Sequence, residues 1–164
     1  MQPVIEHLLA RKNKQVPVED GRKIALVLFG GIMVGVRGMG ALVALEELGL
    51  AHSFDYIYTM SSGFINASYF LSGQMTLGAA AYYQELSGKK FLNLLRFWNI
   101  ADINYLMGVI KTKKPLNVDA VLSSKTKLSR VETTPSNLRK AAVRMGSLVK
   151  NAFGSNKKIN LKPW

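Results

Sequence analysis

One stretch decides the fold of this chain: residues 22–63, RKIALVLFGGIMVGVRGMGALVALEELGLAHSFDYIYTMSSG. It begins with an apolar run at 24–29 that has no polar alternation, which is typical of a strand covered on both faces, as in a parallel sheet. A glycine-rich loop follows, and apolar residues at helical spacing then lead to Gly49, which is placed to end a helix. A second strand, 54–59, comes just before Ser61 and the next helical pattern, which Gly73 is placed to end. The order of these patterns predicts an α/β fold.

Ser61 occupies a predicted sharp turn between a strand and a helix, with Gly63 two residues later. Such a turn projects a hydroxyl from the carboxyl end of the sheet, and small neighbours let the strand and the helix approach closely. We expect the two strands to be adjacent and parallel, with a right-handed helical crossover between them. The glycine loop should then lie beside Ser61, where its N–H groups could bind an oxyanion. A plain turn serine is the structural alternative.

The two motifs resemble those of the patatin-like phospholipases. That family has a glycine loop with a basic residue, a helix that carries Ala-Leu-Glu-Glu-Leu-Gly, and a G-x-S-x-G motif preceded by Phe-Asp-x-Ile. The matching positions are Gly30-Gly31, Gly35, 40–49, 54–57, 59–63 and 65–67. The resemblance covers residues 22–73 and extends more weakly to about Leu122.

The resemblance implies a three-layer α/β fold with a mostly parallel sheet and a nucleophile-elbow serine, C-terminally incomplete in this chain. It implies a serine lipid acyl hydrolase, a phospholipase or esterase that needs no cofactor and no metal. Ser61 would be the catalytic nucleophile. The oxyanion hole would be formed by Gly30, Gly31, Ile32 and Gly35. The substrate would be a phospholipid or another acyl ester.

Three positions depart from the family pattern. Ile32 stands where the third glycine of the loop is expected, and Val34 stands where the basic residue is expected, with Arg37 three residues further on. Thr59 replaces the first glycine of the serine motif. If position 32 requires a positive φ, a β-branched residue is strongly disfavoured there.

A catalytic base is harder to place than the nucleophile. His7 and His52 precede the two predicted strands, so they should lie at the opposite edge of the sheet from Ser61, roughly 17–20 Å away. A Ser-His-Asp triad is therefore not expected. The resembling family uses an aspartate from a downstream Asp-Gly motif, but no Asp-Gly follows Ser61, and Asp102 and Asp119 lack the glycine.

Asp20-Gly21 has the letters of that motif but precedes the first strand, so the same geometric objection applies. Either the chain ends before the aspartate or the pair has been lost. Because a serine without a base is a weak nucleophile, we expect an impaired hydrolase. The alternative is a non-catalytic lipid- or membrane-binding protein on the same scaffold.

Nucleotide binding is not expected. Gly30 and Gly35 have the spacing of a P-loop, but Val36-Arg37 stands where Lys-Ser/Thr is needed. The second strand ends without the acidic residue of a dinucleotide site. The absence of cysteine excludes disulfides and thiolate metal sites.

The charge of the 164-residue chain is uneven along its length. Residues 1–110 carry 9 basic and 8 acidic side chains, whereas residues 111–164 carry 13 basic and 2 acidic ones. The expected organisation is an N-terminal helix and arm (1–21), a partial α/β domain (22–134) with a poorly alternating strand near 126–134, and a basic amphipathic tail (135–164).

A tail helix is predicted at 136–153. It would favour an anionic membrane surface, with nucleic acid as a weaker option and a solvated surface helix as the plain one. The N-terminus has no signal-peptide run, and the apolar run that starts at Ile24 is too short to span a membrane. A cytoplasmic protein is expected, peripheral at a membrane if the tail binds lipid.

Overall fold

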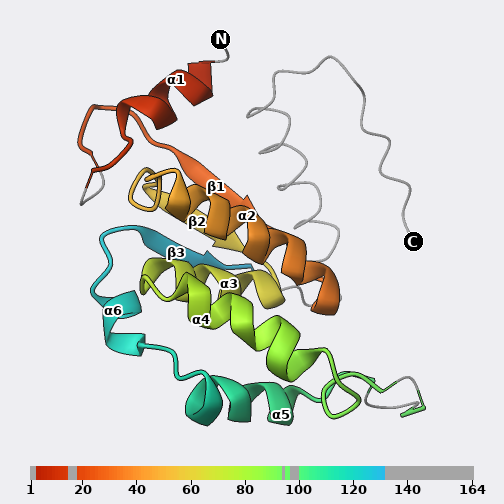
Figure 1. The fold of residues 1–164 in the computed structure, drawn as a ribbon. Coiled ribbons are helices and arrows are strands. Elements are labelled where there is room, and N and C mark those ends of the chain that lie inside the picture. Colours follow the sequence, from red (N-terminus) through yellow and green to blue (C-terminus); the bar gives the residue numbers. More distant parts are fainter. Residues whose placement is uncertain (1–2, 15–17, 94, 97–99, 132–164) are drawn as a thin grey trace, which may run out of the picture. The chain divides into compact units, whose positions relative to one another are not determined.

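In the computed structural model, residues 3–14, 18–93, 95–96 and 100–131 can be described. Apart from Val131 they belong to one compact unit, residues 1–130 (Figure 1). The elements follow in this order: α1 (Pro3–Ala10), β1 (Ala25–Leu28), the 3-10 turn η1 (Ile32–Val34), α2 (Gly35–Glu47), β2 (Tyr56–Thr59), α3 (Ser62–Leu71), α4 (Met75–Ala80), the π-helical turn η2 (Ala81–Leu86), α5 (Ile103–Gly108), the π-helical turn η3 (Val109–Lys113), α6 (Val118–Leu122) and β3 (Lys127–Arg130).

The three described strands form one parallel sheet in the order β1-β2-β3. Leu26 pairs with Ile57, and Ile57 pairs with Leu128, so all three strands run in register toward the same edge. The predicted adjacency and parallel direction of the first two strands are confirmed. The third strand lies inside the stretch where a poorly alternating strand was predicted.

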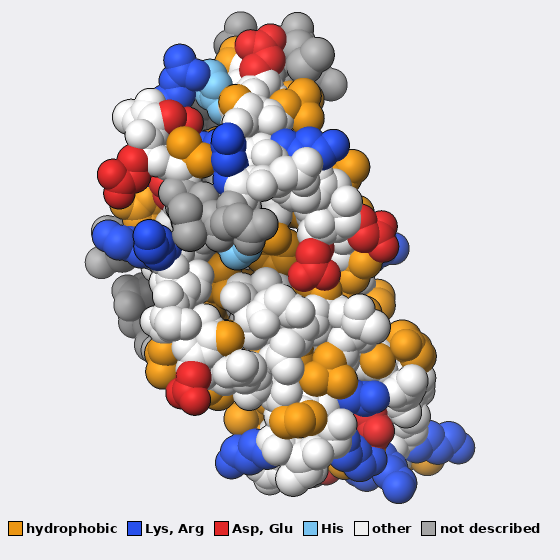
Figure 2. Space-filling view, turned by 60° about the vertical axis from the view of Figure 1, so that its left-hand side comes forward, with side chains coloured by type: hydrophobic (Ala, Val, Ile, Leu, Met, Phe, Trp, Pro, Cys, Tyr) orange, Lys and Arg blue, Asp and Glu red, His pale blue; other side chains and the backbone are white. Residues whose placement is uncertain are grey.

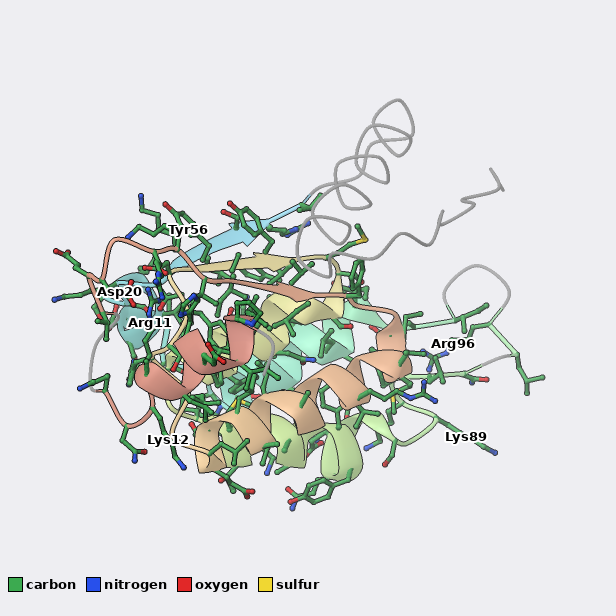
Figure 3. The ribbon with its side chains drawn as sticks, turned by 90° about the horizontal axis from the view of Figure 1, so that it is seen from above. Arg11, Lys12, Asp20, Tyr56, Lys89 and Arg96 are labelled. Atoms are coloured by element: carbon green, nitrogen blue, oxygen red, sulfur yellow. The ribbon has the colours of Figure 1, made fainter. Side chains whose placement is uncertain are left out.

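Helices α2, α3 and α4 lie on one face of the sheet (Figure 3): α3 contacts β1 and β2 directly, and α2 and α4 pack against α3 and each other. The core lies between them and the strands, and its fully buried side chains include Leu42, Ile57 and Ala67. Among the described residues, no helix covers the other face, where Tyr56 and Tyr58 stack with ring centroids 6.2 Å apart. The fold class is α/β as expected, and the described residues make two of the three expected layers.

Two helices end where the sequence predicts. Gly49 follows α2 at φ +75° and Gly73 follows α3 at φ +66°, a conformation that glycine adopts without a β-carbon penalty. Helix α2 begins earlier than the apolar period starting at Ala41 predicts, because Gly35 and Gly38 are helical. A β-carbon on Gly35 would meet the Ser62 side chain on α3, so this glycine permits close helix packing rather than loop freedom.

A buried ion pair that the sequence did not predict ties the N-terminal arm to the sheet. Arg11, only 1% exposed, donates to Asp55 at 2.8 Å and to Asp20 at 2.6 Å. Its guanidinium also donates to the carbonyl oxygens of Ser53 and Arg22. Arg11 and Asp20 lie at the end of the sheet where the strands begin (Figure 3). The arm therefore fixes the starts of β1 and β2.

Charges of both signs are interspersed on the face shown in Figure 2. None of the helices in the described part of the chain is long and apolar enough to cross a membrane. The predicted basic tail helix, 136–153, lies outside the described residues.

Candidate active site

Ser61 sits in a strained turn between β2 and α3. Its backbone has φ +52° and ψ −128°, a combination that costs a non-glycine residue roughly 1–3 kcal/mol and that concentrates at functional sites. Ser61 occupies the N-cap position of α3, yet its side chain makes no capping hydrogen bond. A serine kept only for helix capping would use its hydroxyl for that bond. The exposed hydroxyl is instead presented to solvent.

Two glycines allow the loop and both strands to converge on this turn. A β-carbon at Gly30 would lie 2.5 Å from the carbonyl oxygen of Met60 and 2.6 Å from the Ser61 β-carbon. A β-carbon at Gly63 would lie 2.6 Å from the carbonyl oxygen of Leu28. The glycine loop therefore lies beside Ser61, as the sequence predicts.

The loop amides divide into two groups. The N–H of Val34 donates to the Gly31 carbonyl at 2.9 Å, and the N–H of Gly35 donates to the carbonyls of Ile32 and Met33. These two amides are engaged within the turn. Oxyanion binding was also predicted for Gly35, but its N–H is not free for it in this conformation.

The remaining amides are available. Within the described part of the chain, the N–H groups of Gly30, Gly31, Ile32 and Ser62 have no acceptor. Ser62 was not among the predicted donors. The rule that the residue after a nucleophilic serine supplies an oxyanion donor would have identified it.

Position 32 does adopt a positive φ, at +50°. Ile32 is β-branched and 43% exposed, so it carries strain in the left-handed region with little compensating burial. The preceding Gly31, at φ +134°, adopts a conformation that suits glycine alone.

Replacement of Ile32 by glycine should therefore raise the free energy of unfolding by about 0.5–1 kcal/mol, because the relieved strain exceeds the added chain entropy. Val34→Gly is the matched control, since Val34 is also exposed but has φ −64°. It should lower stability by a similar amount. Urea unfolding measures both variants. Equal losses from the two substitutions would contradict the strain at Ile32.

No described residue is placed to act as the base. The Ser61 hydroxyl makes no hydrogen bond within the described part of the chain. His7 contacts Arg22, and His52 is exposed before β2, so both histidines lie toward the start of the strands. Asp20 is held by Arg11 at that same end (Figure 3).

Neither of the two aspartates that follow Ser61 in the sequence is placed as its base. Asp102 caps α5 by accepting from the Tyr105 N–H at 2.9 Å, and it pairs with Arg96 at 3.5 Å. Asp119 is exposed on α6. Neither carboxylate contacts Ser61.

No protein-family model matches this chain, and neither a curated protein nor a solved structure matches it. The resemblance to the patatin-like phospholipases therefore stands on the motif residues alone.

Apolar side chains are exposed in the glycine loop beside Ser61. Phe29, Ile32, Val34 and Val36, all in or next to the glycine loop, are between 43% and 60% exposed. Lys89 and Arg96 project at the end of the molecule toward which the strands point, the end that also holds the Ser61 turn (Figure 3). Exposed apolar surface beside the Ser61 turn suits a ligand with an apolar part.

Proposed function

We propose that this chain carries the nucleophile and the oxyanion donors of a patatin-like serine lipid acyl hydrolase, a phospholipase or esterase, on a three-layer α/β fold. One observation supports it above the others. The strained turn holds Ser61 exposed and without a capping bond, next to amides that have no acceptor in the described part of the chain. A purely structural turn serine has no reason to combine these features.

In the proposed reaction the Ser61 oxygen attacks the ester carbonyl carbon. The carbonyl oxygen gains the negative charge, and the N–H groups of Gly31, Ile32 and Ser62 donate to it. Collapse of this intermediate breaks the bond to the alcohol and leaves an acyl group on Ser61, which water then removes. The serine proton needs a base, and the described residues offer none near Ser61. Turnover by this chain is therefore expected to be slow.

An acyl ester of a lipid fits the surroundings better than a small polar ester. The exposed side chains of Phe29, Val34 and Val36 can contact an acyl chain, and each apolar contact is favoured by removal of surface from water. Lys89, at the same end of the molecule, offers positive charge to an anionic head group, whereas Arg96 pairs with Asp102.

A non-catalytic lipid-binding protein is the second candidate. It is favoured by the lack of a base near Ser61 among the described residues and by the strained backbone of Ile32 in the glycine loop. In both cases the basic residues after position 110 favour a peripheral position at an anionic membrane surface of the cytoplasm over binding of nucleic acid.

Reaction with an alkyl fluorophosphonate separates the two candidates. The serine oxygen bonds to phosphorus, fluoride leaves, and the adduct remains on the protein. The wild type and Ser87→Ala, which changes an exposed serine bonded to the Tyr83 carbonyl, should both be labelled. Ser61→Ala should not react. A wild type that binds lipid but gives no adduct would exclude the hydrolase and leave the binding protein.

A further inference from the structure

Two consecutive buried hydrogen bonds lie close to the Ser61 turn. Asn66 on α3 is fully buried, and its Nδ2 donates to the carbonyl oxygen of Gly35 at 2.8 Å. The Oδ1 of the same side chain accepts from the hydroxyl of Tyr82, in η2, at 2.9 Å. Burial raises the pKa of Tyr82, so its hydroxyl stays protonated and remains a donor near neutral pH. Asn66 thus links the Tyr82 hydroxyl to the Gly35 carbonyl.

The carbonyl group that accepts the hydrogen bond from Asn66 lies at the end of the glycine loop. Gly35 is the first residue of α2, and its own N–H closes the 3-10 turn by donating to the carbonyls of Ile32 and Met33. Asn66 therefore holds Gly35 through its carbonyl, and the Gly35 N–H ties the same residue to the loop whose free amides lie beside Ser61.

The Ser62 hydroxyl belongs to the same cluster. It is buried, and its contact with the Tyr82 hydroxyl partly offsets the rise in the pKa of Tyr82 that burial causes. It and the Tyr82 hydroxyl both face the α-carbon of Gly35, where a β-carbon would lie 2.5 Å and 2.8 Å from their oxygens. Both hydroxyls therefore pack closely against Gly35, where the glycine loop joins α2.

We infer that Asn66 and Tyr82 are positioning residues for the glycine loop: they hold Gly35, and through its N–H the turn that carries the Gly31 and Ile32 amides, relative to Ser61. This inference rests on the proposed function for its catalytic consequence. The structural consequence, an ordered loop, can be measured without any activity.

Tyr82→Phe tests this role, because it removes one hydroxyl and keeps the ring. Tyr69→Phe is the matched control: Tyr69 is also buried, and its hydroxyl donates to the Lys114 carbonyl, which does not belong to the loop. Both variants should lower the midpoint of urea unfolding by a similar amount. Amide hydrogen exchange at Val34 and Gly35, followed by NMR, should become about tenfold faster in Tyr82→Phe only.

The fluorophosphonate provides a second readout. Labelling of Ser61 should be about tenfold slower in Tyr82→Phe and unchanged in Tyr69→Phe, because a displaced donor loses its alignment. Equal effects of the two variants on exchange at Val34 and Gly35 would overturn the positioning role. If the wild type is not labelled, the proposed function fails, and the exchange measurement still decides whether Asn66 and Tyr82 order the loop.

Discussion

Replacement of Arg11 by alanine is expected to lower the free energy of unfolding by about 3 kcal/mol, because it breaks a buried ion pair and leaves a carboxylate behind. Arg11 is 1% exposed and serves two carboxylates and two carbonyl oxygens. Without it, Asp55 keeps the Ile24 N–H at 2.7 Å and Lys23 at 3.3 Å. These partners stabilise Asp55 only in part, so the effect should be large but short of complete unfolding.

Urea unfolding of the Arg11→Ala variant measures this loss. Lys12→Ala is the matched control, since Lys12 is the next residue, carries the same charge and is exposed (Figure 3). It should change stability by less than about 0.5 kcal/mol. Similar effects of the two variants would show that the buried ion pair does not hold the arm.

The same cluster should make stability depend on pH. The hydrogen bond from Arg11 lowers the pKa of Asp20. Burial alone would raise the pKa of Asp55, but hydrogen bonds from Arg11, the Ile24 N–H and Lys23 outweigh it, and the net direction is down. Carboxyls with a lowered folded pKa add stability above their unfolded pKa, 3.8, which is lost as the pH falls further. The wild type should therefore lose stability below about pH 4, and Arg11→Ala should show a shallower loss.

Gly30→Ala is expected to lower the free energy of unfolding by about 2–3 kcal/mol and to prevent labelling of Ser61. The added methyl group would lie 2.5 Å from the Met60 carbonyl oxygen and 2.7 Å from the Ser62 nitrogen, both backbone atoms. Because neither atom can rotate away, the loop or the serine turn must shift. A shift of either moves the proposed amide donors away from the oxyanion.

Gly40→Ala is the control for this substitution, because Gly40 belongs to the same glycine-rich motif. It lies exposed within α2, and a β-carbon there meets nothing within 4 Å. Alanine at this position should raise stability by about 0.5–1 kcal/mol and leave labelling intact. If Gly30→Ala were tolerated as well as Gly40→Ala, the close contact between the glycine loop and the Ser61 turn would be wrong.

The predictions that succeeded depend on local or periodic signals. An unbroken apolar run predicted β1, and Gly49 and Gly73 predicted the ends of α2 and α3. The strand–turn–helix order around Ser61 placed the glycine loop beside it, because parallel strands end at one edge.

The features that the sequence did not reveal depend on contacts between distant segments. Arg11 and Asp55 are 44 residues apart, and nothing in the local pattern pairs them. Tyr82 reaches Asn66 only after α4 has folded back along α3. The early start of α2 was missed because glycine usually indicates a loop. At Gly35 the glycine instead allows close packing against Ser62 and Tyr82. Side-chain partners of this kind are set by the three-dimensional fold, so local sequence patterns do not identify them.

The most direct test of the central claim is peptide mapping of the wild-type chain after reaction with an alkyl fluorophosphonate. We expect one adduct, on Ser61, formed slowly because the described residues supply no base, and absent from Ser61→Ala. An unmodified Ser61 under conditions that label a known serine hydrolase, or an adduct on another serine with Ser61 unchanged, would contradict its assignment as the nucleophile.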